Sequence, residues 1–184
     1  MLHEKSTRAK IGIIAIAVGL IGMIIALFLP TIMTETLHFS KDNIILLTPK
    51  NNLIISISSL VLIVATLILL ALKHTKLTYS LAILTIIGIL GFCGWTLTNY
   101  QVIQSDQIIV KSYQNEQVMN WADIQSVVYE YGGDKLPYGQ YIFQTANDEI
   151  IIGETAKFST EQKQKIYSTA RSLDITFTER ESLQ

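Results

Sequence analysis

LTYSLAILTIIGILGFCGWTLTNYQVIQS, residues 77–105, is the stretch that decides the fold, because it runs without a charged residue between Lys76 and Asp106. About 20 helical residues span the roughly 30 Å hydrocarbon core of a bilayer, so this stretch is longer than one crossing requires. Similar apolar runs precede it, whereas shorter apolar runs divided by turn residues follow it. The sequence therefore predicts a membrane domain over residues 1–105 and a small soluble domain over residues 106–184.

Two further charge-free runs, residues 11–34 and 51–72, complete the membrane domain. With 49% hydrophobic residues and a mean hydropathy of +0.38, the chain is more apolar than a small water-soluble protein can hide. We expect transmembrane helices over about residues 11–30, 53–72 and 79–100. None of the runs contains Asp, Glu, Lys, Arg or His, the residues that usually mark ion and proton pathways.

The N-terminal run has two interpretations. A basic start before an apolar core is typical of a signal peptide, but this core is long and no small-x-small cleavage site follows it, so we favour an uncleaved helix. Small residues recur every three or four positions in the first and third runs, which places each set on one helix face and predicts helix packing. These residues are Ala15, Gly19, Gly22 and Ala26 in the first run and Gly88, Gly91 and Gly94 in the third.

Three crossings place the segment of residues 31–52 on the same side as the C-terminal domain. Its apolar strips, Leu37 with Phe39 and residues 44–47, flank the turn-like residues 40–43 and predict a hairpin. We expect this segment to pack against the domain and to bury Phe39 or Ile45. Five Lys and Arg residues flank the helices on the side of the N-terminus, and three flank them on the side of the C-terminal domain. This difference favours a cytoplasmic N-terminus and a C-terminal domain outside the plasma membrane.

The C-terminal domain is predicted to consist mainly of strands. Alternating and short apolar runs indicate strands over residues 107–113, 116–121, 125–131, 140–145 and 149–153, with an exposed loop at residues 132–137. A helix follows over about residues 160–173, with Ser159 as its N-cap and Gln162 as the capping-box partner. A short strand over residues 175–178 closes the domain. The fold class is therefore a multi-pass membrane protein with three helices followed by a β-rich domain with one C-terminal helix.

Two sequence segments resemble the bacterial pleckstrin-homology-like domains that are attached to transmembrane helices. They are DQIIV at residues 106–110 and VMNWADIQSV at residues 118–127. The resemblance covers about residues 100–175 and implies a partly open barrel or curved sheet capped by a helix, with an interaction or assembly role. Phosphoinositide recognition is disfavoured, because the first hairpin loop, residues 111–116, offers one cation and one acid where several cations are needed.

The residues of the C-terminal domain offer little catalytic chemistry. Its sequence contains no His or Cys, which excludes nucleophilic triads and thiolate chemistry, and no glycine-rich phosphate loop is present. Asp148 and Glu149 are adjacent, but neighbours on a strand point to opposite faces, so we interpret them as a solvated turn. Seven basic against twelve acidic residues give residues 106–184 a charge of -5, which argues against nucleic acid as a partner. We expect no cofactor, no metal and no catalysis.

A group of tyrosines brackets the loop at residues 132–137 and suggests an interaction surface. The candidate surface consists of Tyr129, Tyr131, Asp134, Lys135, Tyr138 and Tyr141. The alternative is that Tyr129, Tyr131 and Tyr141 are half-buried sheet residues. The leading hypothesis is a membrane-anchored interaction or assembly module in the lipid bilayer that binds another membrane or envelope protein. The alternative is an accessory subunit of a transporter or secretion complex that acts through its helices, and an enzyme dependent on Asp123 or Glu130 is the weakest hypothesis.

Overall fold

The computed structural model describes residues 2–73, 75–133 and 138–181, with side chains from residue 9 onward. The chain forms two compact units, Met1–Thr36 with Thr48–Asn99, and Leu37–Leu47 with Tyr100–Gln184. We call them the helical unit and the sheet unit. The expected boundary between residues 105 and 106 differs from this division. The segment Leu37–Leu47 and the strand that begins at Tyr100 both belong to the sheet unit.

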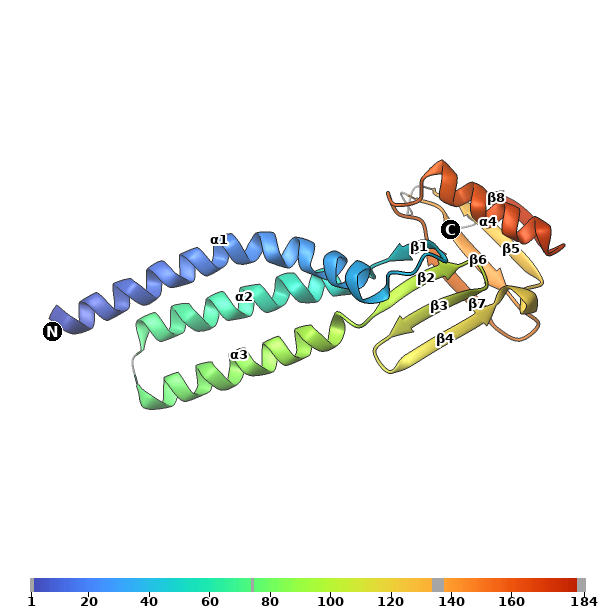
Figure 1. Ribbon diagram of the computed structural model, residues 1–184. Helices are drawn as coiled ribbons and strands as arrows, with labels where there is room; N and C mark the ends of the chain where they lie inside the picture. The colour runs from blue at the N-terminus through green and yellow to red at the C-terminus, as the bar shows by residue number, and fades with distance from the viewer. Residues whose placement is uncertain (1, 74, 134–137, 182–184) are drawn as a thin grey trace. The chain divides into compact units, whose positions relative to one another are not determined.

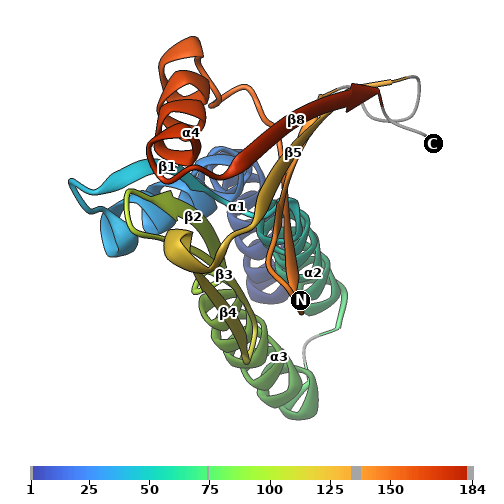
Figure 2. The ribbon, with the colours of Figure 1, turned by 90° about the vertical axis from the view of Figure 1, so that its right-hand side faces the viewer.

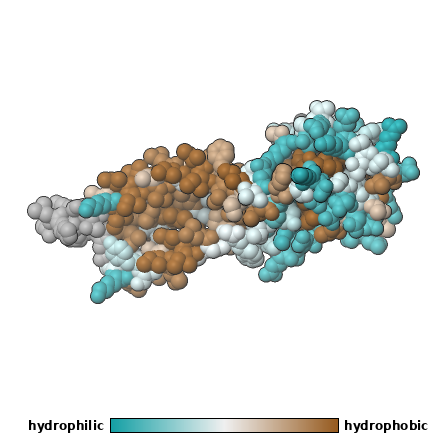
Figure 3. Space-filling view, viewed as in Figure 1, coloured by the Kyte–Doolittle hydropathy of each residue, from teal (hydrophilic) through white to brown (hydrophobic). Residues whose placement is uncertain are grey.

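The helical unit consists of α1 (Leu2–His38), α2 (Lys50–Leu72) and α3 (Lys76–Thr96), and α1 ends in the sheet unit (Figure 1). All three helices are long and apolar enough to cross a membrane. Hydrophobic residues cover the face of the helices seen in Figure 3. The helix α1 continues through Pro30 to His38, beyond the expected end near residue 30. The helix α3 ends at Thr96 instead of near residue 100, because Tyr100 begins a strand.

The small residues of α1 lie against α2. Ala15 and Ala26 are buried, a Cβ added at Gly19 would lie 3.7 Å from Val64 Cγ2, and one added at Gly22 would collide with Leu60. The missing side chains at Gly19 and Gly22 therefore leave room for the side chains of Val64 and Leu60 of α2. The three glycines of α3 differ. A Cβ added at Gly88, Gly91 or Gly94 would meet no atom within 4 Å, so their face is open among the described residues.

The sheet unit contains two four-stranded sheets (Figure 1). The first has the order β1-β2-β3-β4 and is antiparallel throughout. Its strands are β1 (Asn43–Leu47), β2 (Tyr100–Gln104), β3 (Gln107–Ser112) and β4 (Asn115–Asn120). The second has the order β7-β6-β5-β8, and β8 runs parallel to β5. Its strands are β5 (Ser126–Tyr131), β6 (Gln140–Gln144), β7 (Glu149–Gly153) and β8 (Thr176–Glu181), and α4 (Thr160–Ser172) precedes β8. A β-rich domain with a C-terminal helix is thus confirmed.

The strand β1 corrects one local prediction and confirms another. The expected hairpin within residues 31–52 is wrong, because Leu37 and His38 end α1 and the second apolar strip pairs with β2. The prediction that this segment packs on the C-terminal domain is confirmed, since Ile45 is buried in the core of the sheet unit. Phe39, the other candidate, is 75% exposed.

One core joins the two sheets and α4. Trp121 and Phe143 are fully buried and meet edge to face at 5.7 Å between ring centroids, and Ile166 and Ala170 of α4 pack into the same cluster. Trp121 also donates its Nε1–H to the carbonyl of Gln104 at 2.8 Å, which satisfies its only polar atom. The predicted capping box of Ser159 is present at the start of α4. In Figure 2, α4 lies beside β1 and β8, with which it is in contact.

Candidate functional site: the groove between two sheet edges

The sheet unit is closed on one side and open on the other. The helix α4 contacts β1 and β8, which are one edge of each sheet. The opposite edges are β4 and β7, and no described strand pairs with the free side of either. An edge strand presents unpaired backbone N–H and C=O groups with which a strand of another chain can pair. The two free edges therefore identify this side of the unit as the candidate site.

The direction of the free backbone groups of β4 follows from its pairing with β3. Trp121 N–H donates to the carbonyl of Asp106 at 3.0 Å, directly beyond the end of the continuous β3–β4 register. Residues of an antiparallel pair alternate between bonding the partner strand and pointing away from it. Gln117 and Met119 therefore bond to β3, whereas the N–H and C=O groups of Glu116, Val118 and Asn120 point to the free edge.

The same argument applies to β7. Thr145 N–H donates to Asp148 O at 2.9 Å and Glu154 N–H donates to Gly139 O at 2.7 Å, at the two ends of the β6–β7 register. The alternation then places the N–H and C=O groups of Glu149, Ile151 and Gly153 on the free edge. Both edges thus present three residues with backbone groups available for a further strand.

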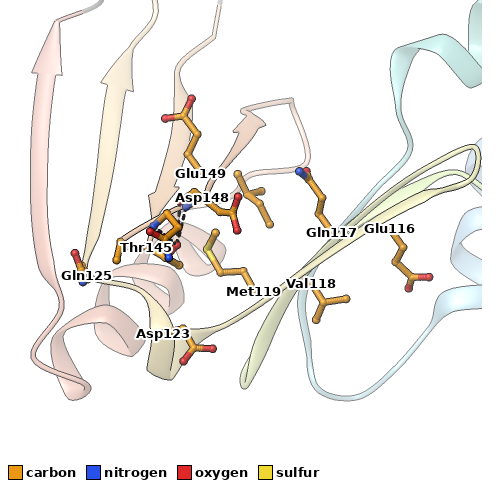
Figure 4. A pocket seen from close by; sticks show the side chains of 12 residues that line it. Glu116, Gln117, Val118, Met119, Asp123, Gln125, Thr145, Asp148 and Glu149 are labelled. Carbon is orange, nitrogen blue, oxygen red and sulfur yellow. Dashed lines mark hydrogen bonds between the residues drawn. The ribbon is translucent and has the colours of Figure 1, made fainter.

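A groove of about 560 Å³ is formed by these two edges and the turn before β7. Figure 4 shows residues of β4 on one wall and the turn of residues 145–148 on the other, with the Met119 side chain between them. Met119 and Ile150 are buried and supply an apolar floor. Val118, by contrast, is 52% exposed on an edge strand, where a large aliphatic side chain has little packing to gain.

The charged residues that line the groove are all acidic. They are Glu116, Asp123, Asp148 and Glu149. Lys111 Nζ lies 3.6 Å from a carboxylate oxygen of Glu116, and Asn120 Nδ2 donates to Asp123 Oδ2 at 3.1 Å. Among the described residues, no ion pair involves Asp123, Asp148 or Glu149. The groove therefore carries net negative charge and attracts cations.

The structure distributes the predicted tyrosine surface over different environments. Tyr131 and Tyr138 are exposed, Tyr129 is half-buried, and Tyr141 is only 3% exposed and stacks on Phe158. Tyr141 is therefore a core residue and not part of a surface, because the apolar face of β6 packs into the shared core. Asp134 and Lys135 lie outside the described residues.

Tyr129 belongs to a polar network beside α4. Its hydroxyl donates to Glu154 Oε2 at 2.5 Å, Glu154 is ion-paired with Lys163, and the Lys163 Nζ lies 5.6 Å from the centroid of the Tyr129 ring. Burial, followed by the hydrogen bond to the Glu154 carboxylate, raises the pKa of Tyr129. The hydroxyl thus stays protonated and acts as a structural donor that ties β5 to the end of β7.

Glu130 was one of the two residues named for the enzyme hypothesis. Its carboxylate is engaged by two neighbouring side chains. Gln140 Nε2 donates to one carboxylate oxygen at 2.6 Å, and Arg180 Nη2 lies 2.5 Å from the other. These hydrogen bonds, from Gln140 first and Arg180 second, lower the pKa of Glu130 against the opposing effect of burial. Glu130 thereby ties β8 and β6 to β5. Within the described ranges, no group of three or more His, Cys, Asp or Glu side chains is arranged to hold a metal ion.

No protein-family model matches the chain, and no curated protein shows significant sequence similarity to it. The candidate site therefore rests on the geometry of the sheet unit alone.

The groove was not predicted from the sequence. The strands that form both of its walls were predicted. Their sequence patterns do not show which strands become edges, because the same alternation occurs at the centre and at the edge of an antiparallel sheet. One signal was present. Val118 is apolar on the side of β4 opposite the buried Met119, which is unusual for a strand with one solvated face.

Proposed function

We propose that the chain is a three-span membrane protein whose sheet unit acts as a protein-interaction or assembly module. The observation that carries this proposal is the open side of the sheet unit, where β4 and β7 leave two free edges around an acidic groove with an apolar floor. Extended segments of partner proteins commonly bind such edges by adding a strand. The three apolar helices would hold the module at the lipid bilayer.

The fold of the module is proposed to be pleckstrin-homology-like. Two features support this: consecutive antiparallel strands β2–β3–β4 and β5–β6–β7 lie in separate sheets, and a helix follows β7 and packs on the shared core. Two features differ from a simple two-sheet sandwich of consecutive strands. The strand β1 comes from the segment between two transmembrane helices, and β8 joins β5 in parallel.

The topology proposal is that the N-terminus is cytoplasmic and the sheet unit lies outside the plasma membrane. The pairing of β1 with β2 requires an even number of crossings between them, which α2 and α3 would supply, because both strands must lie on one side of the bilayer. Reporters fused after Gln184, one active only outside and one fluorescent only inside the cell, test the orientation. An active outside reporter agrees with the excess of Lys and Arg on the N-terminal side. A fluorescent inside reporter would instead make the sheet unit a cytoplasmic adaptor.

Site-specific photocrosslinking in host-cell membranes tests the interaction module. A photoreactive phenylalanine analogue replaces Val118 on β4 or Ile151 on β7 in the full chain, and Tyr167 on α4 serves as a control of similar exposure, at 45%. We expect both edge-strand positions to form adducts with the same protein, and the control position to form none. Adducts from Tyr167 alone would move the interaction to α4, and the absence of all adducts would contradict the module.

A second candidate is the accessory subunit that acts through its helices. The open face of Gly88, Gly91 and Gly94 favours it, because no described residue packs there. The small residues of α1 do not favour this candidate, since Gly19 and Gly22 already lie against α2. Deletion of the sheet unit would leave co-purification with a transporter or secretion complex intact under this candidate and abolish it under the first.

A further inference from the structure

We infer that the groove binds an extended protein segment in which basic and apolar side chains alternate, and that this segment adds as a strand to the free edge of β4. The inference rests on the proposed function and specifies the chemistry of the partner. It combines three independent properties of the groove: the direction of the backbone groups, the sign of the charges and the apolar floor.

The backbone groups determine the conformation of the bound segment. Glu116, Val118 and Asn120 direct their N–H and C=O groups to the free edge, and successive groups of this kind lie about 7 Å apart along a strand. Only an extended chain repeats its own donors and acceptors at that spacing. Four consecutive residues of β4, residues 116–119, line the groove, against two of β7, so β4 is the edge to which the segment pairs.

The charges determine which side chains the segment carries. Asp123, Asp148 and Glu149 face no described basic side chain within ion-pairing distance, and Glu116 meets only Lys111. An incoming Lys or Arg gains attraction from these carboxylates, whereas an acidic segment meets like charges. The same field disfavours nucleic acid and anionic lipid headgroups as occupants.

The apolar floor determines which side chains stand between the basic residues of the segment. Successive side chains of a strand point to opposite faces, so basic residues that face the carboxylates alternate with residues that face the other way. Met119 and Ile150 form an apolar floor, whereas the exposed Val118 and Glu116 lie on the opposite face of β4. A segment that alternates Lys with Val places apolar side chains over the floor and basic side chains among the carboxylates, whereas a uniformly basic segment places charged side chains over the apolar floor.

Binding of synthetic peptides to the full chain tests the inference. The chain is placed in nanodiscs of uncharged phosphatidylcholine, with empty nanodiscs as the blank, and fluorescence anisotropy follows three labelled ten-residue peptides with blocked ends. The first alternates Lys and Val, the second alternates Glu and Val, and the third replaces every second Val of the first with Pro. We expect the Lys-Val peptide to bind at least tenfold more tightly than the other two, because only it offers both the charges and the backbone donors.

Substitutions in the groove separate charge from backbone pairing. Asp148→Asn is expected to weaken the Lys-Val peptide about two- to fivefold, as for an exposed ion pair, while Glu161→Gln on α4 has no effect. Val118→Pro removes an N–H that points to the free edge and none of the N–H groups that bond to β3. It is expected to weaken binding about three- to tenfold, whereas Val118→Thr, which keeps the N–H, changes it less than twofold.

The outcomes distinguish the inference from the proposed function. Equal binding of the Lys-Val and Glu-Val peptides, or unchanged binding in both Asp148→Asn and Val118→Pro, would overturn the inference. Photocrosslinks from Val118 and Ile151 would then still support an interaction module with a different ligand. If neither the crosslinks nor peptide binding were observed, both the inference and the proposed function would be contradicted.

Discussion

Ile45 lies opposite Ile103 in the antiparallel ladder between β1 and β2, although α2 and α3 separate the two residues in the sequence. The ladder is reinforced at its end, where Gln104 Nε2 donates to Asn43 Oδ1 at 2.8 Å and Ser105 N–H donates to Asp42 O at 3.0 Å. The first sheet therefore takes one edge strand from the segment between two apolar helices.

Truncation of Ile45 is expected to destabilise the sheet unit. Ile45→Ala removes a side chain buried in the shared core and should lower the free energy of unfolding by about 2–5 kcal/mol. Phe39→Ala, at an exposed position of the same segment, should change it by less than about 0.5 kcal/mol. Denaturant unfolding of the full chain in detergent, followed by tryptophan fluorescence, measures both. Equal effects of the two variants would show that β1 contributes no core packing.

Gly139 is expected to tolerate no side chain. A Cβ there would lie 2.6 Å from the backbone carbonyl of Glu130 and 2.5 Å from the Tyr129 hydroxyl, and a backbone atom cannot rotate away. Gly139→Ala should therefore lower the free energy of unfolding by about 1–3 kcal/mol, as overpacking does. Gly153→Ala is the matched control, because its Cβ meets nothing within 4 Å. Thermal unfolding of both variants decides the matter, and a Gly139→Ala protein as stable as the control would contradict the close approach.

The ion pair of Glu130 predicts a specific pH dependence. Its pKa is lowered from 4.5 in the folded chain, chiefly by the hydrogen bonds from Gln140 and Arg180. A carboxylate with a lowered folded pKa stabilises the fold fully above its unfolded pKa, and this contribution disappears as the pH falls through the folded pKa. Stability should therefore fall more steeply below about pH 4.5 in the wild type than in Glu130→Gln. Parallel profiles of midpoint against pH would show that the pair contributes nothing.

The packing of α1 on α2 predicts a difference between two glycines. Gly22→Ile would drive a branched side chain into Leu60, whereas Gly91→Ile would enter open space on α3. We expect the first to lower the thermal midpoint of the purified monomer by several degrees and the second to leave it nearly unchanged. Thermal unfolding in detergent measures the shift. A larger effect of Gly91→Ile on the monomer would contradict the arrangement of the helices.

The sequence predicted those elements whose signal is local. Charge-free runs predicted three apolar helices. Short and alternating apolar runs predicted five strands from β3 to β7 within a few residues, and a sixth strand at residues 175–178 corresponds to β8. The strand β2 was assigned to the last helix and the domain linker, because Tyr100, Val102 and Ile103 continue an apolar run in which helix and strand look alike. The edges and the groove depend on which strands become neighbours, and that is set by packing of the whole unit.

The origin of β1 also affects how the protein is made. The ribosome releases Asn43–Leu47 before α2 and α3, so this strand waits unpaired while two further apolar helices are synthesised. The sheet unit thus completes its first sheet only after the third helix, and a fragment that begins at Tyr100 would expose the edge of β2. A soluble version of the unit needs residues 40–47 joined back to it by a linker, for example ahead of Tyr100, in place of the two helices that normally connect them.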